Sequence, residues 1–191
     1  MRLPAGPAVV RPWATADAAE IARQANDRRV WINLRDAFPH PYRLDDAERF
    51  IARATTASPP TVFAIEVDGR PAGGIGYTLH TDVERIGAEV GYWLGAEYWG
   101  RGIATAAVRA LSRHAFATHP ELRRLYALPF SWNPASARVL EKAGYRLEGT
   151  LRQSAIKDGK VVDQWMYALL REELAAQKKA AGGRSGPPAA E

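Results

Sequence analysis

Hydrophobic positions along this chain change between the two-residue period of strands and the three-to-four-residue period of helices. Runs rich in aliphatic, aromatic and β-branched residues predict seven strands, over residues 8–13, 61–67, 71–79, 89–94, 124–128, 146–156 and 161–170. Helical spacing predicts helices after Thr15, from Asp45 to Ser58, from Gly102 to Thr118, from Asn133 to Gly144 and over 171–180, with a shorter one within 30–38.

Turn-forming residues set the order of these elements. Asp68-Gly69 and Asp158-Gly159 each separate two predicted strands, which is the pattern of a tight hairpin. Residues 39–41, Pro-His-Pro, predict an extended segment, because proline restricts its own backbone and that of the residue before it. A helix crosses over between the strands at 89–94 and 124–128, so these two should run parallel. We therefore expect an α+β fold with a mixed, mostly antiparallel seven-stranded sheet flanked by helices.

Residues 89–105, EVGYWLGAEYWGRGIAT, carry the strongest functional pattern in the chain. A strand ends at Gly95, and Gly100-Arg101-Gly102 leads into a helix. The first turn of a helix has backbone N–H groups without partners, and glycines let an anion approach them closely. Thr105 stands where a dinucleotide-binding loop would have its third glycine, and the Walker lysine is absent. The stretch predicts a phosphate site for another kind of carrier, although it would also suit a purely structural strand-to-helix turn.

Two sequence blocks resemble one enzyme family. Residues 99–104 are similar to the pyrophosphate loop of the GNAT N-acyltransferases, [Gln/Arg]-x-x-Gly-x-[Gly/Ala]: Gly102 and Ala104 match, and Trp99 stands where Gln or Arg is usual. A second block at the family's spacing, residues 133–145, reads NPASARVLEKAGY. With the FPHPY motif at 38–42, the pattern resembles the subgroup of ribosomal-protein alanine N-acetyltransferases. The resemblance covers roughly residues 7–172.

This resemblance implies the GNAT acyl-CoA N-acyltransferase fold, with residues 1–172 as the N-acetyltransferase domain. Residues 173–191 form an extension, and we expect its end to be disordered because residues 181–191 cannot bury a core. The resemblance also implies acetyl-CoA as the cofactor and transfer of the acetyl group to an amine by direct attack in a ternary complex. In the family, the central strand splays from its parallel neighbour, which opens an edge for pantetheine. The implied cofactor-binding residues are Tyr92, Trp93, Leu94, Gly100, Arg101, Gly102, Ile103, Ala104, Thr105, Asn133, Ser136 and Lys142.

Ser136 is the candidate general acid. Its spacing with Val139, Leu140 and Ala143 turns it inward with the apolar stripe of its helix. In the resembling subgroup the serine at this position is proposed to protonate the leaving thiolate, and Leu140 stands where many other members have a tyrosine. The alternative is a serine that bonds its own helix backbone or Asn133.

The general base is expected at Glu89. The subgroup's glutamate falls at Ala155 in this chain, which has no carboxylate. Glu89 lies on the central strand beside aromatic residues, where a carboxylate can become a more effective base; the alternative is a structural pair with an arginine. Asp163 is a weaker candidate.

The acceptor amine is expected near the first helices, as the resemblance implies. His40 and Tyr42 are candidate acceptor contacts, and the alternative is a packed proline loop. The acceptor could be a protein N-terminus, a polyamine, an amino acid or an amino-sugar drug.

Composition narrows the remaining possibilities. The absence of cysteine excludes disulfides, thiolate metal sites and a cysteine nucleophile, and the four histidines show no ligand spacing. No apolar run approaches a membrane span and the start does not resemble a signal peptide, so we expect a cytoplasmic, metal-free protein. The net charge of +5 would suit nucleic acid, but the arginines are spread and no nucleic-acid motif accompanies them. An acyl-CoA-binding or ribosome-associated module without turnover is the alternative function, and a homodimer is possible.

Overall fold

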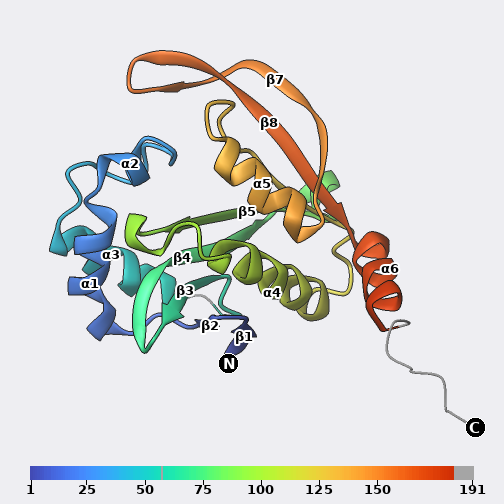
Figure 1. The fold of residues 1–191 in the computed structure, drawn as a ribbon, viewed down its shortest axis with the longest axis horizontal. Coiled ribbons are helices and arrows are strands. Elements are labelled where there is room, and N and C mark those ends of the chain that lie inside the picture. Colours follow the sequence, from blue (N-terminus) through green and yellow to red (C-terminus); the bar gives the residue numbers. More distant parts are fainter. Residues whose placement is uncertain (57, 183–191) are drawn as a thin grey trace, which may run out of the picture.

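One mixed sheet organises the chain. The computed structural model describes residues 1–56 and 58–182, with side chains described over 1–56 and 58–176. The sheet has the strand order β1-β2-β3-β4-β5-β6-β8-β7, and every neighbouring pair is antiparallel except β5 and β6 (Figure 1). The strands are β1 (Leu3–Ala5), β2 (Ala8–Arg11), β3 (Val62–Val67), β4 (Arg70–Leu79), β5 (Gly87–Leu94), β6 (Arg124–Ala127), β7 (Arg146–Lys157) and β8 (Lys160–Leu170). The predicted α+β class and the parallel pair are confirmed.

The sheet has eight strands, so the predicted number of seven is wrong. The additional strand is β1, which pairs with β2 across a turn in which Gly6 has a φ of +61°. With three residues and a proline, β1 is too short to show alternation in the sequence. It is a strand because its neighbour supplies the hydrogen bonds.

In the described residues, six α-helices lie around the sheet. They are α1 (Ala18–Ala25), α2 (Arg28–Trp31), α3 (Leu44–Ala54), α4 (Ile103–Thr118), α5 (Pro134–Ala143) and α6 (Arg171–Gly182). Within these described residues, no helix is long and apolar enough to span a lipid bilayer. Residues 183–191, where we expect a disordered end, lie outside the described residues, and the domain boundary at 172 stays a prediction.

Two predictions between α1 and α3 are wrong. The short helix expected within 30–38 begins earlier, because the Asp27 side chain accepts a hydrogen bond from the Arg29 amide at 2.8 Å and caps α2, which ends at Trp31. The segment at 39–41 is bent, not extended. The His40 ring stacks on Trp31, and the Tyr42 amide donates to the Asn26 side chain at 3.0 Å, so this segment is drawn back towards α1 and α2.

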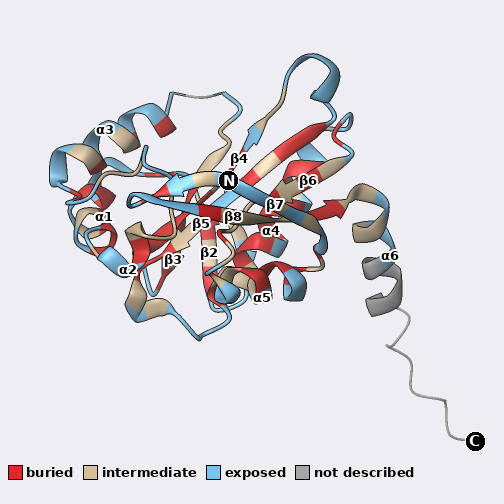
Figure 2. Ribbon diagram, turned by 90° about the horizontal axis from the view of Figure 1, so that it is seen from above, coloured by how far each residue is buried: buried red, intermediate tan, exposed pale blue. Residues whose placement is uncertain are grey.

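The two faces of the sheet carry different helices. Successive side chains of β5 alternate between them: Ala88, Val90 and Leu94 join the large core cluster with α4, whereas Trp93 packs on the cluster that contains α1 and α3. Figure 2 shows the buried residues concentrated on the strands and on the sides of the helices that face them. Strand β5 is therefore enclosed between two helical layers.

Strands β5 and β6 separate soon after they meet. They pair only at Gly87, Ala88 and Glu89 of β5, opposite Arg124, Leu125 and Tyr126. In the same register Tyr92 would face Pro129, which has no N–H to donate. The chain after β6 turns to β8 instead: the Trp165 amide donates to the Pro129 carbonyl at 3.0 Å, and the Gln164 side chain to the Leu128 carbonyl at 3.2 Å. The β5 edge from Val90 onward faces this opening.

The helices on either side of the opening start and end as their sequences predict. Gly102 begins α4 in the left-handed conformation, with a φ of +74°. The Asn133 side chain caps α5 by accepting a hydrogen bond from the Ser136 amide at 3.1 Å, and Gly144 ends the helix with a φ of +97°. These positions follow from local chemistry, because an Asx cap and a glycine C-cap need no distant partner.

A buried ionic network holds the N-terminal helices on the sheet. Arg11 of β2 donates to both carboxylate oxygens of Asp17, at 2.7 and 2.8 Å, and also to Glu66 of β3. All three side chains are at most 13% exposed. Hydrogen bonds from the Arg11 guanidinium hold the pKa of Glu66 below its usual value. The start of α1 is thereby joined to two strands.

Removal of Arg11 should therefore destabilise the fold. We expect Arg11→Met to lower the free energy of unfolding at pH 7 by about 3 kcal/mol, because the buried Asp17 loses its ion-pair partner and Glu66 keeps only its pair with Arg2. The lowered pKa of Glu66 means that its contribution is present above the unfolded pKa of about 4.3 and is lost as the pH falls below it. Urea denaturation at several pH values should show that the free energy of unfolding of the wild type falls in this acidic range, and that the fall is smaller in the variant.

Arg23→Met is the matched control, because Arg23 pairs with Glu20 and Glu97 but is 58% exposed. Its effect should stay within about 1 kcal/mol. Equal destabilisation by the two variants would contradict a special role for the buried network.

Candidate active site

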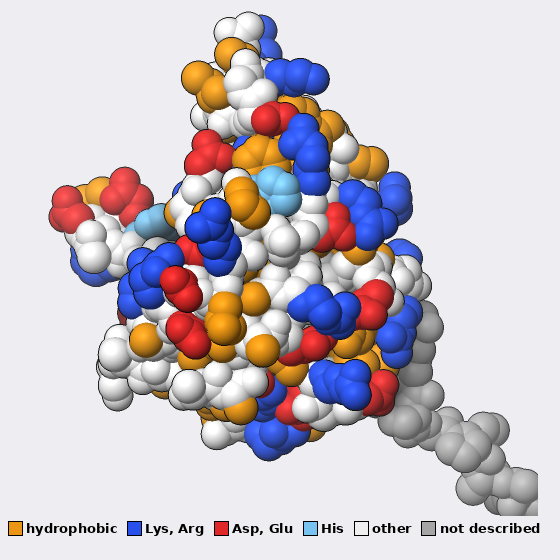
Figure 3. Space-filling model, turned by 90° about the vertical axis from the view of Figure 1, so that its left-hand side faces the viewer, with side chains coloured by type: hydrophobic (Ala, Val, Ile, Leu, Met, Phe, Trp, Pro, Cys, Tyr) orange, Lys and Arg blue, Asp and Glu red, His pale blue; other side chains and the backbone are white. Residues whose placement is uncertain are grey.

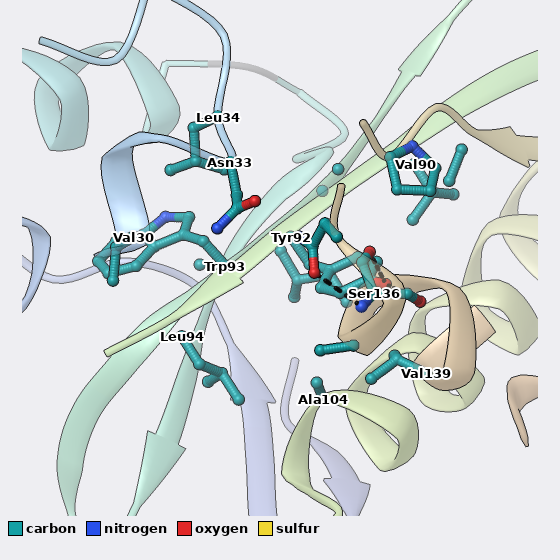
Figure 4. A pocket seen from close by; sticks show the side chains of 18 of the residues that line it. Val30, Asn33, Leu34, Val90, Tyr92, Trp93, Leu94, Ala104, Ser136 and Val139 are labelled. Carbon is teal, nitrogen blue, oxygen red and sulfur yellow. Dashed lines mark hydrogen bonds between the residues drawn. The ribbon is translucent and has the colours of Figure 1, made fainter. Parts of the chain in front are cut away.

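A cavity of about 820 Å³ lies where β5 and β6 separate. Its lining residues fall on the two faces of β5, and Figure 4 shows Asn33 and Leu34 on one side of this strand and Ser136 and Val139 on the other. We call these two parts the α5 side and the α2 side. The α5 side is lined mainly by Tyr92, Gly100, Gly102, Ile103, Ala104, Thr105, Asn133, Ser136, Arg138, Val139 and Lys142. The α2 side is lined mainly by Arg29, Asn33, Leu34, Arg35, Phe38, Tyr42, Phe50, Arg53, Glu89, Gly91 and Trp93.

The glycine loop forms an open cradle at the start of α4. Gly100 and Gly102 both have a φ of +74°, which a residue with a side chain rarely adopts, and no atom lies within 4 Å of where a Cβ would stand on either. No side chain caps the first turn of α4, and no acidic residue lies in it. The backbone N–H groups of this turn are thus available to an anion, and the helix dipole favours one there.

Two cations of α5 complete this side of the cavity. Arg138 and Lys142 line it, and the Lys142 carbonyl accepts a hydrogen bond from Arg109. Arg101, which was predicted with the loop, does not line the cavity, and its guanidinium lies 5.8 Å from the Tyr98 ring centre. Trp99 links the loop to the end of β5, because its ring N–H donates to the Leu94 carbonyl at 2.9 Å.

Tyr92 and Ser136 form a hydrogen-bonded pair in the centre of the cavity. The two hydroxyl oxygens lie 2.7 Å apart, and the Tyr92 oxygen lies 3.2 Å from the Ser136 carbonyl oxygen (Figure 4). Burial raises the pKa of Tyr92, so its hydroxyl keeps its proton at neutral pH. The sequence predicts Tyr92 only as part of the strand edge; its contact with Ser136 has no sequence signal. Leu140, where a tyrosine is usual in the family that the chain resembles, is fully buried in the core.

Glu89 lies on the α2 side and is paired with Arg35. The Arg35 guanidinium donates to Oε1 of Glu89, whose side chain is 23% exposed. Among the described side chains Oε2 has no hydrogen-bond partner. The structural pair that we considered for Glu89 is thus present, and one oxygen remains able to accept a proton.

Ala155, at the position of the subgroup's glutamate, and Asp163, the weaker candidate base, do not line this cavity. Ala155 lines a second, smaller cavity of about 280 Å³, which shares Arg35, Phe130 and Gln164 with the first. Asp163 does not line either cavity; its carboxylate accepts a hydrogen bond from the Gln153 amide at 2.7 Å.

The two expected acceptor contacts are separated by the structure. Tyr42 is 5% exposed, lines the α2 side and packs on Phe38 with ring centres 4.6 Å apart. Burial raises the pKa of Tyr42 to about 12. His40 is exposed and does not line the cavity; its ring stacks on Trp31 with centres 5.3 Å apart.

The tip of the β7–β8 hairpin covers the α2 segment (Figure 1). Lys157, which is 1% exposed, donates to Asp36 at 2.7 Å and lies 3.8 Å from the Trp31 ring centre. Arg28 pairs with Asp158 at 2.7 Å. These contacts hold the α2 wall of the cavity from the opposite end of the chain.

This arrangement suits a reaction between two bound molecules. An anionic carrier fits the amides and cations of the α5 side, and a second molecule can reach the same opening from the α2 side. A hydroxyl that keeps its proton lies on one face of β5, and a carboxylate lies on the other.

Comparisons with known proteins agree with this geometry. Residues 8–146 match the family described as the acetyltransferase (GNAT) domain. The uncharacterized N-acetyltransferase p20 of Bacillus licheniformis is 36% identical over 94 residues, which are 49% of this chain and 52% of that protein. The ribosomal-protein-serine acetyltransferase of Escherichia coli is 38% identical over 81 residues, 42% of this chain and 45% of that protein. The chain thus spans about half the length of the curated relatives it matches.

A solved structure is similar over nearly the whole chain. It is that of Mycobacterium smegmatis RimJ in complex with CoA-disulfide, with a TM-score of 0.79 and 29% identity. The match covers 96% of this chain and 92% of that one.

Proposed function

The chain belongs to the GNAT acetyltransferase family, and from this premise we propose that it transfers an acetyl group from acetyl-CoA to a primary amine by direct attack in a ternary complex. The family is the one that the glycine loop and the block at 133–145 predict. The observation that carries the proposal is the opening between β5 and β6, which has a phosphate cradle and a protonated hydroxyl on one face and a carboxylate on the other.

The residues of the α5 side fit acetyl-CoA. The amides from Gly100 to Thr105 would hold the diphosphate, and the edge of β5 from Tyr92 to Leu94 would pair with the amides of the pantetheine arm. Arg138, Lys142 and Asn133 add polar contacts along α5. When bound there, acetyl-CoA supplies an acetyl group activated as a thioester.

The reaction forms a carbon–nitrogen bond and breaks the carbon–sulfur bond. Glu89 takes a proton from the amine at Oε2, directly or through water. Ser136 donates a proton from Oγ to the departing sulfur and regains one from solvent as coenzyme A leaves, while the Tyr92 hydroxyl donates a hydrogen bond to Ser136 Oγ and orients it. Tyr92 is thus a positioning residue, and no covalent enzyme intermediate is needed.

The acceptor and the setting are also proposals. The printed name of the E. coli relative indicates a ribosomal-protein serine as its acceptor, so a protein N-terminus is one candidate here and a small amine another. A cytoplasmic location is in keeping with such an acceptor, and a homodimer stays a prediction. Ala155 and Trp99 favour the alternative, an acyl-CoA-binding or ribosome-associated module without turnover.

Gly102→Val tests the phosphate cradle. We expect the affinity for coenzyme A, measured by titration calorimetry, to fall at least about tenfold, because the side chain strains the loop and covers the amides. Gly159→Val is the matched control, since Gly159 has a φ of +72° and open surroundings in a hairpin outside the cavity. An equal fall in the affinity for coenzyme A in both variants would argue against the cradle.

Substitutions at the reacting centre test the proton transfers. We expect Ser136→Ala and Glu89→Gln each to lower kcat for amine-dependent thiol release by about a hundredfold, with little change in the KM for acetyl-CoA. Thr118→Ala, at the far end of α4, should leave kcat unchanged. Coenzyme A binding without thiol release on any amine would support the module instead.

Tyr92→Phe tests whether the Tyr92 hydroxyl positions Ser136, because it removes the hydroxyl and keeps the ring. Because it acts through Ser136, we expect it to lower kcat about tenfold in the wild type and to have little further effect in Ser136→Ala. A double-mutant cycle on kcat measures this coupling. Additive losses would show that Tyr92 acts independently of Ser136.

A further inference from the structure

The α2 side of the cavity, which receives the acceptor if the proposed function holds, has an unbalanced set of charges. Its lining includes Arg29, Arg35 and Arg53 but only one carboxylate, Glu89. Figure 3 shows the face of the molecule around this region, on which basic, acidic and apolar side chains are interspersed, so the imbalance is confined to the lining of the cavity. This wall differs from the acidic surface that a polyamine or a basic peptide would need.

Two of these arginines already have partners. Arg35 donates to Glu89, and Arg29 pairs with Asp27 at 2.6 Å. Arg53, in the last turn of α3, makes no ion pair with any described side chain. Its positive charge lowers the pKa of the Tyr42 hydroxyl, as that of Arg49 does, whereas burial and the Asp46 carboxylate raise it. Arg53 is therefore a cation beside Tyr42 that an incoming anion can engage.

Four aromatic rings stand beside these arginines on the α2 side. Phe38, Tyr42, Phe50 and Trp93 line it, and the Phe38 ring lies 5.4 Å from that of Trp93. Gly91 lies between Glu89 and Trp93 on the same face of β5, and no atom lies within 4 Å of where its Cβ would stand. The wall thus offers an apolar surface with open space above β5, next to Arg53.

We propose that the acceptor is an amine on an apolar body that also carries a carboxylate close to the amine. The body packs against Phe38, Tyr42 and Phe50, the carboxylate meets Arg53, and the amine faces Glu89. The guanidinium binds a carboxylate through two parallel hydrogen bonds, which is stronger and more specific than a single neutral bond. A free aromatic or branched amino acid has this chemistry, and so does an apolar N-terminal residue followed by an acidic one.

Matched amines test the proposal on the full chain. Acetyl transfer from acetyl-CoA is measured to L-phenylalanine and L-phenylalaninamide, to the peptide amides Phe-Asp-Gly and Phe-Asn-Gly, and to spermidine. We expect kcat/KM to favour the carboxylate member of at least one pair by about tenfold, and spermidine to be a poor acceptor. The first pair identifies a free amino acid as the source of the carboxylate, and the second an acidic N-terminus.

Arg53 variants show whether this preference comes from the proposed contact. We expect Arg53→Gln to bring the ratio of kcat/KM values within the favoured pair close to one, and Arg53→Lys to keep part of the preference. The two amines differ in basicity, but this difference is the same for variant and wild type. Comparing the ratio between the two proteins therefore removes its effect. Arg49→Gln is the matched control, because Arg49 lies on the same helix, pairs with Asp46 at 2.6 Å and does not line the cavity.

The outcomes separate this proposal from the one on which it rests. Transfer to spermidine or to the carboxylate-free amines at equal or higher kcat/KM, or a ratio that Arg53→Gln leaves unchanged, overturns the acceptor class while the acetyltransferase remains. Coenzyme A binding without transfer to any amine overturns the proposed function itself.

Discussion

The separation of β5 from β6 is the constraint on which this site depends. A parallel pair would normally continue its hydrogen bonds along the strand, but here pairing stops at Glu89. Pro129 cannot donate where β5 would need a partner, and the Leu128 and Pro129 carbonyls bond to residues of β8. Unpaired backbone groups of β5 then face the opening and can bind an extended ligand, as an added strand would.

The same separation divides the chemistry between two faces. Alternation along β5 sends Tyr92 to the α5 side and Glu89 to the α2 side. Ser136 reaches Tyr92 from α5, and Arg35 reaches Glu89 from the segment after α2. The proposed proton donor and the proposed proton acceptor are thus held apart by one strand. Both groups can reach the same bound molecules only through the opening between β5 and β6.

The α2 side of the cavity depends on contacts between distant parts of the chain. Arg11 connects β2, the start of α1 and β3, and Lys157 of the β7–β8 hairpin reaches Asp36 and Trp31. Helix α2 has only four residues, too few to be stable alone, so these contacts decide its position. The position of Glu89 relative to Arg35 and Tyr42 follows from them.

Local chemistry in the sequence was sufficient for much of this protein. The two Asp-Gly hairpins, the Asn133 cap, the Gly144 C-cap and the glycine loop before α4 follow from backbone preferences of neighbouring residues. The resemblance to the family was carried by the glycine loop, the block at 133–145 and the motif at 38–42. Tertiary structure alone decided β1, the bend at His40, the Tyr92–Ser136 bond and the Glu89–Arg35 pair. Those partners lie 44 and 54 residues apart, and such contacts depend on how the elements pack rather than on any local preference.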